Sequence, residues 1–307
     1  MRVTNNLMAD TVKGNLFKNT ERLLDIQNTI ASGKRINKPS DDPIGMGKVL
    51  DYRKTISTID QYSRNIGHAQ SWLGLADSAL SSVDELLMRA KELAVSQATE
   101  TSSQETRAIA AEEVKNIYDQ ILQLANTKSG NSYIFAGHIT DTAPFSRDAD
   151  GVEGTADDFD AVYHGDTGDI STIIGEDVDI KINENGESVF QNAASGGENI
   201  FDTLRDLIDG LETNDTDAIS NQIEPLDDAL DQILGKRANV GAKINRLEST
   251  ENYWAEFKLN VTKMLSNTED ADMTEAITNL TTQEAVYQAS LAVAARVIQP
   301  TLLDFLR

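Results

Sequence analysis

Cysteine is absent from this sequence of 307 residues. The chain therefore has no disulfide framework, no thiolate metal site and no cysteine nucleophile. Aromatic residues make up only 6% of the sequence, and there are five prolines. A chain poor in aromatics suits helix-on-helix packing better than a thick β-sandwich core. The sparse prolines leave long stretches that can form uninterrupted helices.

Long hydrophobic runs are also missing. No segment approaches the ~18 consecutive apolar residues that a membrane-spanning helix requires, so we expect no membrane insertion. The first ten residues, MRVTNNLMAD, lack the charged-then-apolar order of a secretory signal. We therefore expect no cleaved signal peptide.

Basic residues are scarce in one part of the chain. Between Ile139 and Gly235 there are 25 acidic and three basic residues, whereas the remainder has 25 acidic and 24 basic residues. The formal net charge of −23 therefore comes almost entirely from one region. Such a region repels phosphate backbones and anionic headgroups, which argues against nucleic acid as a partner. A solvated outer surface is the simplest interpretation.

Apolar residues recur at spacings of three and four in three long stretches. These stretches run from Ile66 to Ala94, from Ala110 to Leu124 and from Ile219 to Leu265. Arg237 and two other polar residues interrupt the third stretch without shifting its phase. A seam that repeats every seven residues over this length indicates coiled-coil packing rather than strands. We predict three long helices packed side by side.

The two ends of the chain carry a narrower version of the same pattern. A single amphipathic helix of this kind is marginal in water, because most helix stability comes from packing. Each end therefore needs a partner, and the simplest partner is the other end. We predict that the two seams form the assembly surface. The assembly residues are Leu16, Leu23, Ile26, Ile30, Leu280, Leu291, Ile298 and Phe305, and the seams also contain Val12, Ile277, Tyr287 and Ala294.

The helical period disappears between about residues 132 and 190. Short β-prone pieces at 133–135, 161–163, 171–174 and 178–182 are separated by turns such as Asn185-Gly186. Asn-Gly and Asp-Gly pairs favour hairpins. We predict a small antiparallel β-domain inserted into the helices, followed by a short helix over 200–211.

The predicted fold is mainly α with an inserted β region: a long coiled-coil rod formed by both chain ends, plus a small antiparallel outer domain. Five segments follow from this interpretation. They are an N-terminal core helix and turn (1–45), the first part of the rod (46–131), the β-rich outer domain (132–198), the return part of the rod (199–271) and a C-terminal core helix (272–307).

Catalytic and cofactor motifs are not found. The three histidines are scattered, with no HExxH spacing, and no phosphate-binding P-loop or dinucleotide fingerprint occurs. Ser195 lies in a glycine-rich loop without the strand–turn–helix context of a hydrolase serine. We predict that the chain is not an enzyme and that it holds no cofactor.

One stretch resembles a calcium-binding loop. Ser146, Asp148, Asp150 and Gly151 are followed by Asp157 at the twelfth position. Alternating oxygen ligands with a turn glycine suit the ion. However, the first ligand position is Ser, the last is Asp rather than Glu, and no helices flank the loop. An acidic hairpin tip is the competing interpretation, and we predict no resident metal.

The segment after the first helix has two interpretations. Ser40, Asp41, Asp42 and Pro43 have the composition of a helix N-terminus, with Ser40 or Asp41 as the cap and Pro43 in the first turn. The same residues would also suit a turn that folds back the first helix and contacts a neighbouring molecule. The adjacent Lys34 and Arg35 suit either a bridge between subunits or a solvated face.

These stretches resemble the flagellin superfamily. Residues 32–43 (SGKRINKPSDDP) resemble the signature that follows its first helix, and residues 131–145 are similar to the entry into its outer domain. Residues 245–248, 269–272 and 302–307 resemble the flagellin-type C-terminus. The resemblance covers about residues 1–145 and 240–307. The prolines at 39 and 43 look more like the hook–filament junction branch than like filament flagellins.

The resemblance implies a structural role in the bacterial flagellum. It implies export through the flagellar type III channel, with a chaperone in the cytosol, to an extracellular site. There a ring of copies of the chain would join the first junction protein to the flagellin filament. The terminal helices would form the tubular inner core. Two alternatives stay open, namely a flagellin filament subunit and, from a different class, a calcium-dependent adhesin.

Overall fold

The structure is a computed structural model that describes residues 2–100, 102–147, 159–191 and 196–303. Side-chain surroundings are described from residue 7 to residue 296 within these ranges. Helices dominate, and the three periodic stretches are helical as predicted. The helices are α1 (Arg2–Ser32), α2 (Pro43–Gln97), α3 (Gln104–Ala125), α4 (Gly186–Phe190), α5 (Ile200–Glu212), α6 (Thr216–Asn221), α7 (Ile223–Glu269) and α8 (Met273–Leu303).

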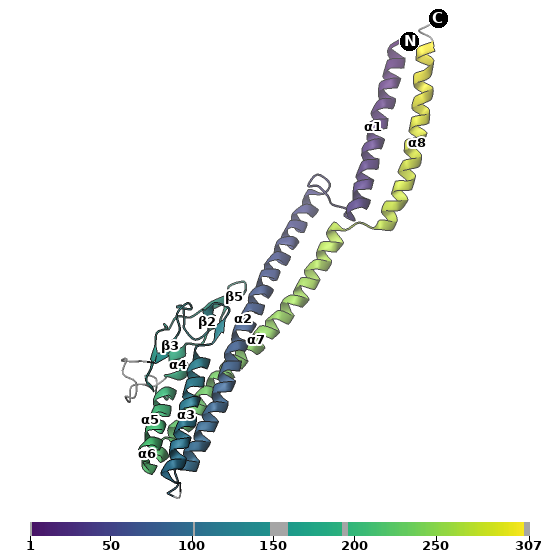
Figure 1. The fold of residues 1–307 in the computed structure, drawn as a ribbon. Helices are drawn as coiled ribbons and strands as arrows, with labels where there is room; N and C mark the ends of the chain where they lie inside the picture. The colour runs from purple at the N-terminus through teal and green to yellow at the C-terminus, as the bar shows by residue number, and fades with distance from the viewer. Residues whose placement is uncertain (1, 101, 148–158, 192–195, 304–307) are drawn as a thin grey trace. The chain divides into compact units, whose positions relative to one another are not determined.

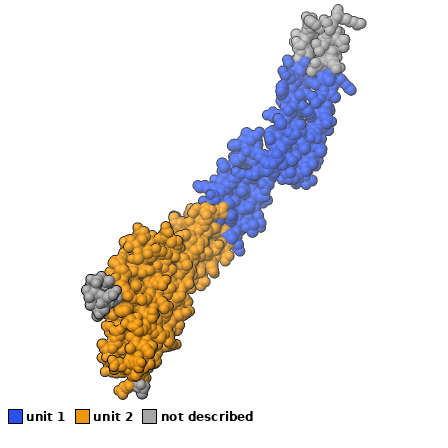
Figure 2. Space-filling view, viewed as in Figure 1, with its two compact units in different colours: residues 1–59, 255–307 blue, residues 60–254 orange. Residues whose placement is uncertain are grey.

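The chain divides into two compact units (Figure 2). Unit 1 comprises residues 1–59 and 255–307, and unit 2 comprises residues 60–254. Both boundaries fall inside the long helices α2 and α7, so each of these helices contributes to both units. Figure 1 shows α1 beside α8 and α2 beside α7. This pairing of N-terminal with C-terminal helices confirms the predicted fold class.

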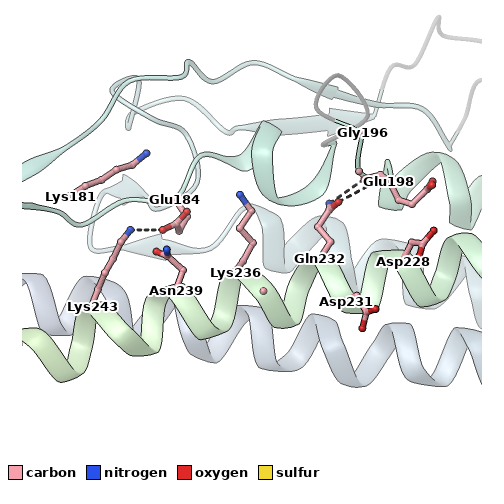
Figure 3. A pocket seen from close by; sticks show the side chains of 12 residues that line it. Lys181, Glu184, Gly196, Glu198, Asp228, Asp231, Gln232, Lys236, Asn239 and Lys243 are labelled. Carbon is pink, nitrogen blue, oxygen red and sulfur yellow. Dashed lines mark hydrogen bonds and ion pairs between the residues drawn. The ribbon is translucent and has the colours of Figure 1, made fainter.

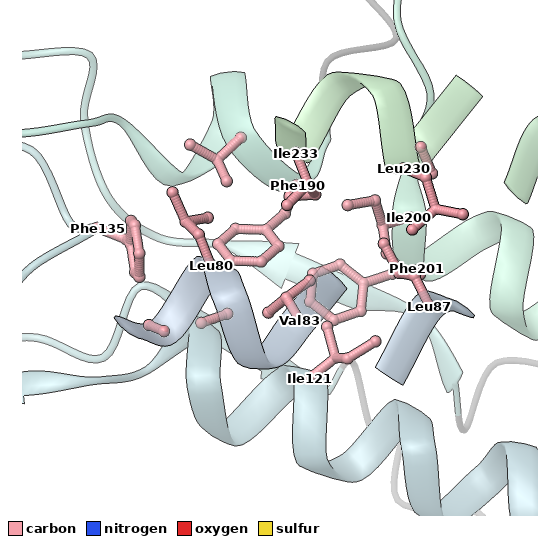
Figure 4. Packing of buried hydrophobic residues seen from close by; sticks show 14 of the residues in the cluster. Leu80, Val83, Leu87, Ile121, Phe135, Phe190, Ile200, Phe201, Leu230 and Ile233 are labelled. Atoms are coloured by element: carbon pink, nitrogen blue, oxygen red, sulfur yellow. The ribbon is translucent and has the colours of Figure 1, made fainter. Parts of the chain in front are cut away.

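A continuous hydrophobic core holds unit 2 together (Figure 4). The apolar faces of α2, α3, α5 and α7 converge on Phe190 and Phe201, whose ring centroids lie 6.0 Å apart. Leu87 of α2, Ile121 of α3 and Ile233 of α7 pack in the same cluster and are fully buried. The 3-4 periodicity places these residues on inward faces, and the burial of those faces stabilises the unit.

Replacing Phe201 with Ala is expected to lower the free energy of unfolding by about 3–5 kcal/mol, because it removes a buried ring and leaves a cavity. The ring lies 5.4 Å from that of Tyr118 and 5.3 Å from that of Phe145. Urea denaturation followed by circular dichroism measures the change. The exposed Ile109→Ala is the control, with an expected change within about 0.5 kcal/mol. Equal effects of the two substitutions would contradict this account of the core.

Polar ties supplement the core where the apolar pattern breaks. Arg237, which interrupts the seam of α7, reaches Asp77 at 3.4 Å and Asp84 at 3.3 Å, both on α2. The two carboxylates are seven residues apart, so they lie on the same face of α2. The polar residue that interrupts the apolar seam of α7 therefore forms ion pairs with α2. Arg107 is 3% exposed and donates to the carbonyls of Gln97 and Thr99, which ties the α2–α3 turn to the start of α3.

The inserted β region consists of three antiparallel pairs in the part of the chain that the structure describes. The pairs are β1 (Lys128–Ser129) with β2 (Ser132–Tyr133), β3 (Phe145–Arg147) with β4 (Ala161–Tyr163), and β5 (Ser171–Gly175) with β6 (Val178–Lys181). The prediction of strands at 161–163, 171–174 and 178–182 is confirmed to within a residue. The strand predicted at 133–135 is wrong beyond Tyr133, because Ile134 and Phe135 leave the pair and enter the core.

The hairpin predicted at Asn185-Gly186 is wrong. Asn185 instead caps α4, and its side-chain oxygen accepts the backbone N–H two residues further on at 2.9 Å. Gly186 is required there because a Cβ would come within 2.8 Å of the carbonyl oxygen of Phe135. The turn between β5 and β6 lies at Asp177, which has a φ of 55°. Asparagine favours helix caps as well as turns, so the Asn-Gly dipeptide alone does not distinguish a helix cap from a hairpin turn. The short helix predicted over 200–211 is confirmed as α5.

Candidate assembly interface

The terminal helices α1 and α8 meet along one seam (Figure 1). From α1, the predicted residues Leu16, Leu23, Ile26 and Ile30 lie half-buried. From α8, Leu280 is half-buried, while Ala276 and Ala294 are almost fully buried. The structure therefore brings together five of the predicted assembly residues.

The seam is thin and partly polar. The Asn19 amide donates to the Ser290 hydroxyl at 2.8 Å, and the Gln283 amide donates to the Asn19 carbonyl at 3.3 Å. Small and polar side chains bury little apolar area. The pair therefore gains much less from the hydrophobic effect than the core of unit 2 does. A helix pair with so little burial belongs to the low-stability end of a protein.

Leu291 and Ile277 do not lie in the seam, contrary to the prediction. They are 43% and 51% exposed. Each directly follows a seam position, the half-buried Ser290 or the buried Ala276, and one residue turns a helix by about 100°. The predicted Ala294 is buried in the seam and Tyr287 is half-buried, whereas the larger Ile277 and Leu291 face outward. The predicted Ile298 lies where no side chain is described, and Phe305 lies outside the described residues.

Large apolar side chains instead cover the outer faces of the pair. Phe17 and Leu24 on α1, and Val286, Leu291 and Val293 on α8, are all exposed. Residues seven apart share a face, so Phe17 forms one stripe with Leu24, and Val286 forms another with Val293. Exposed apolar stripes of this kind mark interaction surfaces.

A shallow groove runs along one of these stripes. It has a volume of about 290 Å³ and is lined by Val12 and Asn15 of α1 and by Val286, Ala289, Ser290 and Val293 of α8. The groove is mostly apolar and lies at the edge of the seam. It therefore offers a second seam to an additional helix.

The connections at the inner ends of α1 and α8 are fastened to each other. The backbone N–H of Arg35 donates to the carbonyl of Glu269 at 2.7 Å, and that of Ala271 donates to the carbonyl of Gly33 at 3.0 Å. The Arg35 guanidinium also donates to the carbonyl of Thr268 at 2.8 Å. These bonds form a short antiparallel bridge between two segments more than 230 residues apart in sequence.

The carboxylate of Glu269 closes this bridge from inside. Its side chain is 4% exposed, and one of its oxygens binds the Lys34 ammonium at 2.6 Å and also the Arg53 guanidinium. A buried carboxylate is costly unless it is paired and hydrogen-bonded, and here two cations satisfy it. Lys34 and Arg35, which the sequence left open as subunit bridges, thus have partners within the chain.

The turn before α2 has its cap one residue later than expected. Asp42, rather than Ser40 or Asp41, caps the helix, and its carboxylate accepts the N–H of Gly45 at 2.8 Å. Pro43 is the first helical residue, as predicted. Asp41 folds back instead and accepts the backbone N–H groups of residues 37 and 38. Its carboxylate therefore fixes the loop rather than the helix.

Two carboxyl groups in these connections are expected to make the region sensitive to acid. Backbone N–H donors hold the pKa of Asp41 and of Asp272, which caps α8, below the ordinary value of 3.8. Because the folded pKa is the lower one, the stabilisation is present at neutral pH and is lost as the pH falls through that pKa. Hydrogen exchange at the start of α8 should therefore be faster in Asp272→Ala than in the parent at pH 7. The difference should shrink as the pH falls through the folded pKa of Asp272, and a difference that does not change with pH would contradict this role.

Only part of the stretch that resembles a calcium-binding loop lies within the described residues. Asp148, Asp150 and Asp157 lie outside the described residues. Ser146 is described and lies in β3, where its hydroxyl bonds His164 Nε2 at 2.7 Å. Its side-chain oxygen is therefore engaged with the His164 ring, and the absence of a resident metal in this loop stays a prediction. No group of three or more metal-ligating side chains occurs among the described residues.

Two functional features escaped the sequence analysis. The role of Glu269 was hidden because its burial depends on two cations far away in the sequence. The stripe formed by Val286 and Val293 was not predicted, although these residues are seven apart. The prediction used only the one heptad series with the most apolar residues. No helix within the described ranges is long and apolar enough to cross a membrane.

Paired terminal helices that leave large apolar side chains exposed on their outer faces are the main feature of this region. Models of the bacterial flagellin N-terminal and C-terminal helical regions match residues 3–140 and 223–306. The chain therefore belongs to the bacterial flagellin family, whose members are structural rather than enzymatic.

Similar proteins include both junction proteins and flagellins. The chain is 29% identical over 272 residues to flagellar hook-associated protein 3 of Escherichia coli K12, covering 85% of this chain and 86% of that protein. It is 26% identical to the protein of the same name in Salmonella typhimurium, covering 94% and 95%. It is 27% identical to the flagellin of Bacillus subtilis, covering 97% of each chain.

Solved structures share the fold. A putative flagellar hook-associated protein from Vibrio parahaemolyticus superposes with a TM-score of 0.67 at 24% identity, covering 75% of this chain and all of that one. FlgL from Bacillus cereus superposes with a TM-score of 0.59 at 22% identity, covering 70% and 99%.

Proposed function

We propose that this chain is the subunit of a junction ring in the bacterial flagellum, placed between the first hook–filament junction protein and the flagellin filament. Its likeness to hook-associated protein 3 from two organisms, over 85% of the chain or more, is the observation that carries the proposal. The prolines at 39 and 43 support the same branch of the family.

The mechanism rests on the thin seam and the exposed stripes. In the monomer, α1 and α8 have only each other, and the pair leaves Phe17, Leu24, Val286 and Val293 in water. Docking onto a preceding ring would bury these side chains at about 25 cal/mol per Å² and offset the entropy lost on ordering the ends. Order that depends on neighbours limits premature polymerisation.

Each predicted assembly residue has a proposed part in this mechanism. Leu16, Leu23, Ile26, Ile30 and Leu280 would hold the two ends of one subunit together. Leu291, which is exposed, would contact a neighbouring subunit, as would Ile298 and Phe305. Asp42 and Pro43 would fix the turn from which the α1–α8 pair is presented.

The proposed partners follow from the ring position. They are other copies of the chain, the first junction protein, flagellin and an export chaperone in the cytosol. Export would use the flagellar type III channel, and the final site would be extracellular. The acidic segment between Ile139 and Gly235 would be solvated on the outer side of the ring.

A gene deletion followed by electron microscopy tests the proposal. We expect hooks without filaments, and flagellin released into the medium, because flagellin would have no ring on which to start. Restoration by the intact gene is the control. Filaments of normal length in the deletion strain would refute the junction role.

A filament flagellin is the second candidate, because the B. subtilis flagellin matches 97% of the chain. The two functions differ in how far assembly proceeds. Purified chain that is seeded on isolated hooks should stop at a short ring if it is a junction protein. Growth into long filaments would favour flagellin.

A further inference from the structure

A groove of about 830 Å³ lies along the N-terminal half of α7 in unit 2 (Figure 3). Its volume falls within the roughly 300–1,000 Å³ that small-molecule sites occupy. One side is a face of α7 that carries Lys236, Asn239 and Lys243 at spacings of three and four. The other side is formed by Lys181 at the end of β6 and by residues 196–198.

Three lysines, Lys181, Lys236 and Lys243, gather at one end of this groove. Lys181 pairs with Asp169 and Lys243 pairs with Glu184, each at 2.5 Å. Lys236 has no carboxylate within ion-pair distance among the described residues, and its ammonium bonds the Ser188 hydroxyl at 3.2 Å. It is therefore the cation at this end that lacks a counter-charge.

The surroundings of Lys236 disfavour its charged form. Burial lowers the pKa of Lys236, and the charges of Lys181 and Lys243 add to this effect, while Glu184 opposes it. An ammonium that is partly desolvated and repelled by its neighbours would be stabilised by a bound anion.

The groove is also held open. Gly235 lies in the middle of α7, where glycine weakens a helix, yet a Cβ there would meet no atom within 4 Å. The opposite wall contains Gly196 and Gly197. Gln232 fixes that wall, since its amide donates to the Val189 carbonyl at 2.9 Å and its oxygen accepts the Glu198 N–H at 3.1 Å.

We propose that the lysine end of this groove binds a small, doubly charged oxyanion, for which phosphate is the best match. Lysine ammoniums act as point charges for phosphate, and here Lys236 supplies the unpaired one beside Lys181 and Lys243, which already bind carboxylates. The far end of the groove carries Glu198, Asp228 and Asp231. These carboxylates repel an extended polyanion, so the site selects a single phosphate group, either free or on a small monoester.

Titration of the intact chain with inorganic phosphate, followed by isothermal calorimetry, tests the site. We expect saturable millimolar binding that weakens about tenfold in Lys236→Met, because a charge-assisted contact is lost. Gly235→Gln should abolish binding by filling the groove without changing its charge. Lys91→Met, which removes a lysine of α2 paired with Asp227, is the matched control and should bind as the parent does.

Circular dichroism establishes that each variant is folded before it is titrated. Glycerol phosphate distinguishes the source of the ligand: tighter binding than inorganic phosphate assigns a monoester, and equal binding assigns recognition of the phosphate group alone. No saturable binding, or parent-like binding by both Lys236→Met and Gly235→Gln, would overturn the proposal. Tighter binding of a long polyphosphate would overturn the selection by the acidic end.

Discussion

Replacing Val286 and Val293 together with Asp is expected to abolish incorporation of the chain into the flagellum while leaving the monomer folded. Both side chains are exposed on the same stripe of α8, so the substitutions break no contact within the core of unit 2. In the proposed ring, however, each carboxylate would be buried against a neighbour. Burying an unpaired polar group costs about 2–7 kcal/mol, which predicts a loss of incorporation of at least roughly a hundredfold.

The measurement is complementation of the deletion strain, scored by motility and by electron microscopy, with circular dichroism of the purified variant. Val178→Asp is the matched control, because Val178 is also 41% exposed but lies in the β5–β6 pair of unit 2. We expect the control to restore filaments and the double variant to leave bare hooks. Normal filaments with the double variant would show that this stripe of α8 does not carry assembly.

The second large effect is expected at Glu269. Glu269→Gln keeps the shape of the side chain but removes the charge that binds Lys34 and Arg53. Both cations are partly exposed, so the loss is expected to be about 1–3 kcal/mol, below that of a fully buried pair. The loss should be local, because the bridge belongs to unit 1 and the large core belongs to unit 2.

Hydrogen exchange resolved by residue is the suitable measurement. The amides of Arg35 and Ala271 should exchange about tenfold faster or more in Glu269→Gln, whereas amides in the core of unit 2 should be unchanged. Glu256→Gln, an exposed glutamate on the same helix, is the control. Unchanged exchange at Arg35 and Ala271 would mean that the backbone bonds alone hold the bridge.

The extent to which sequence predicts this fold follows from how local each signal is. The long helices α2, α3 and α7 were predictable because their apolar residues repeat at the helical period over many turns, and each added turn strengthens the signal. In α8 the same reasoning misplaced Leu291, because the seam there is made of alanine and serine and the larger side chains face outward. Apolar periodicity therefore identified α8 as a helix, but it identifies the buried face of a helix only when the largest residues are also the buried ones.

Distant contacts account for most of what sequence alone missed at the candidate sites. Glu269 stands in a family motif, but its burial between Lys34 and Arg53 depends on contacts with residues more than 200 positions away. No local sequence pattern encodes such contacts. Lys236 is one lysine among many in the sequence, and only the fold shows that no carboxylate of the described residues lies within ion-pair distance of its ammonium. Asn185-Gly186 failed for a different reason, since one dipeptide serves both a hairpin and a helix cap.

The central claim is that the terminal helices order themselves through contacts between subunits. Hydrogen exchange of α1 and α8, measured in the purified monomer and again after the chain has been added to isolated hooks, tests it most directly. We predict fast exchange in both helices of the monomer, compared with residues 66–130, and strong protection after assembly. Protection in the monomer equal to that of residues 66–130, or no gain on assembly, would contradict the account.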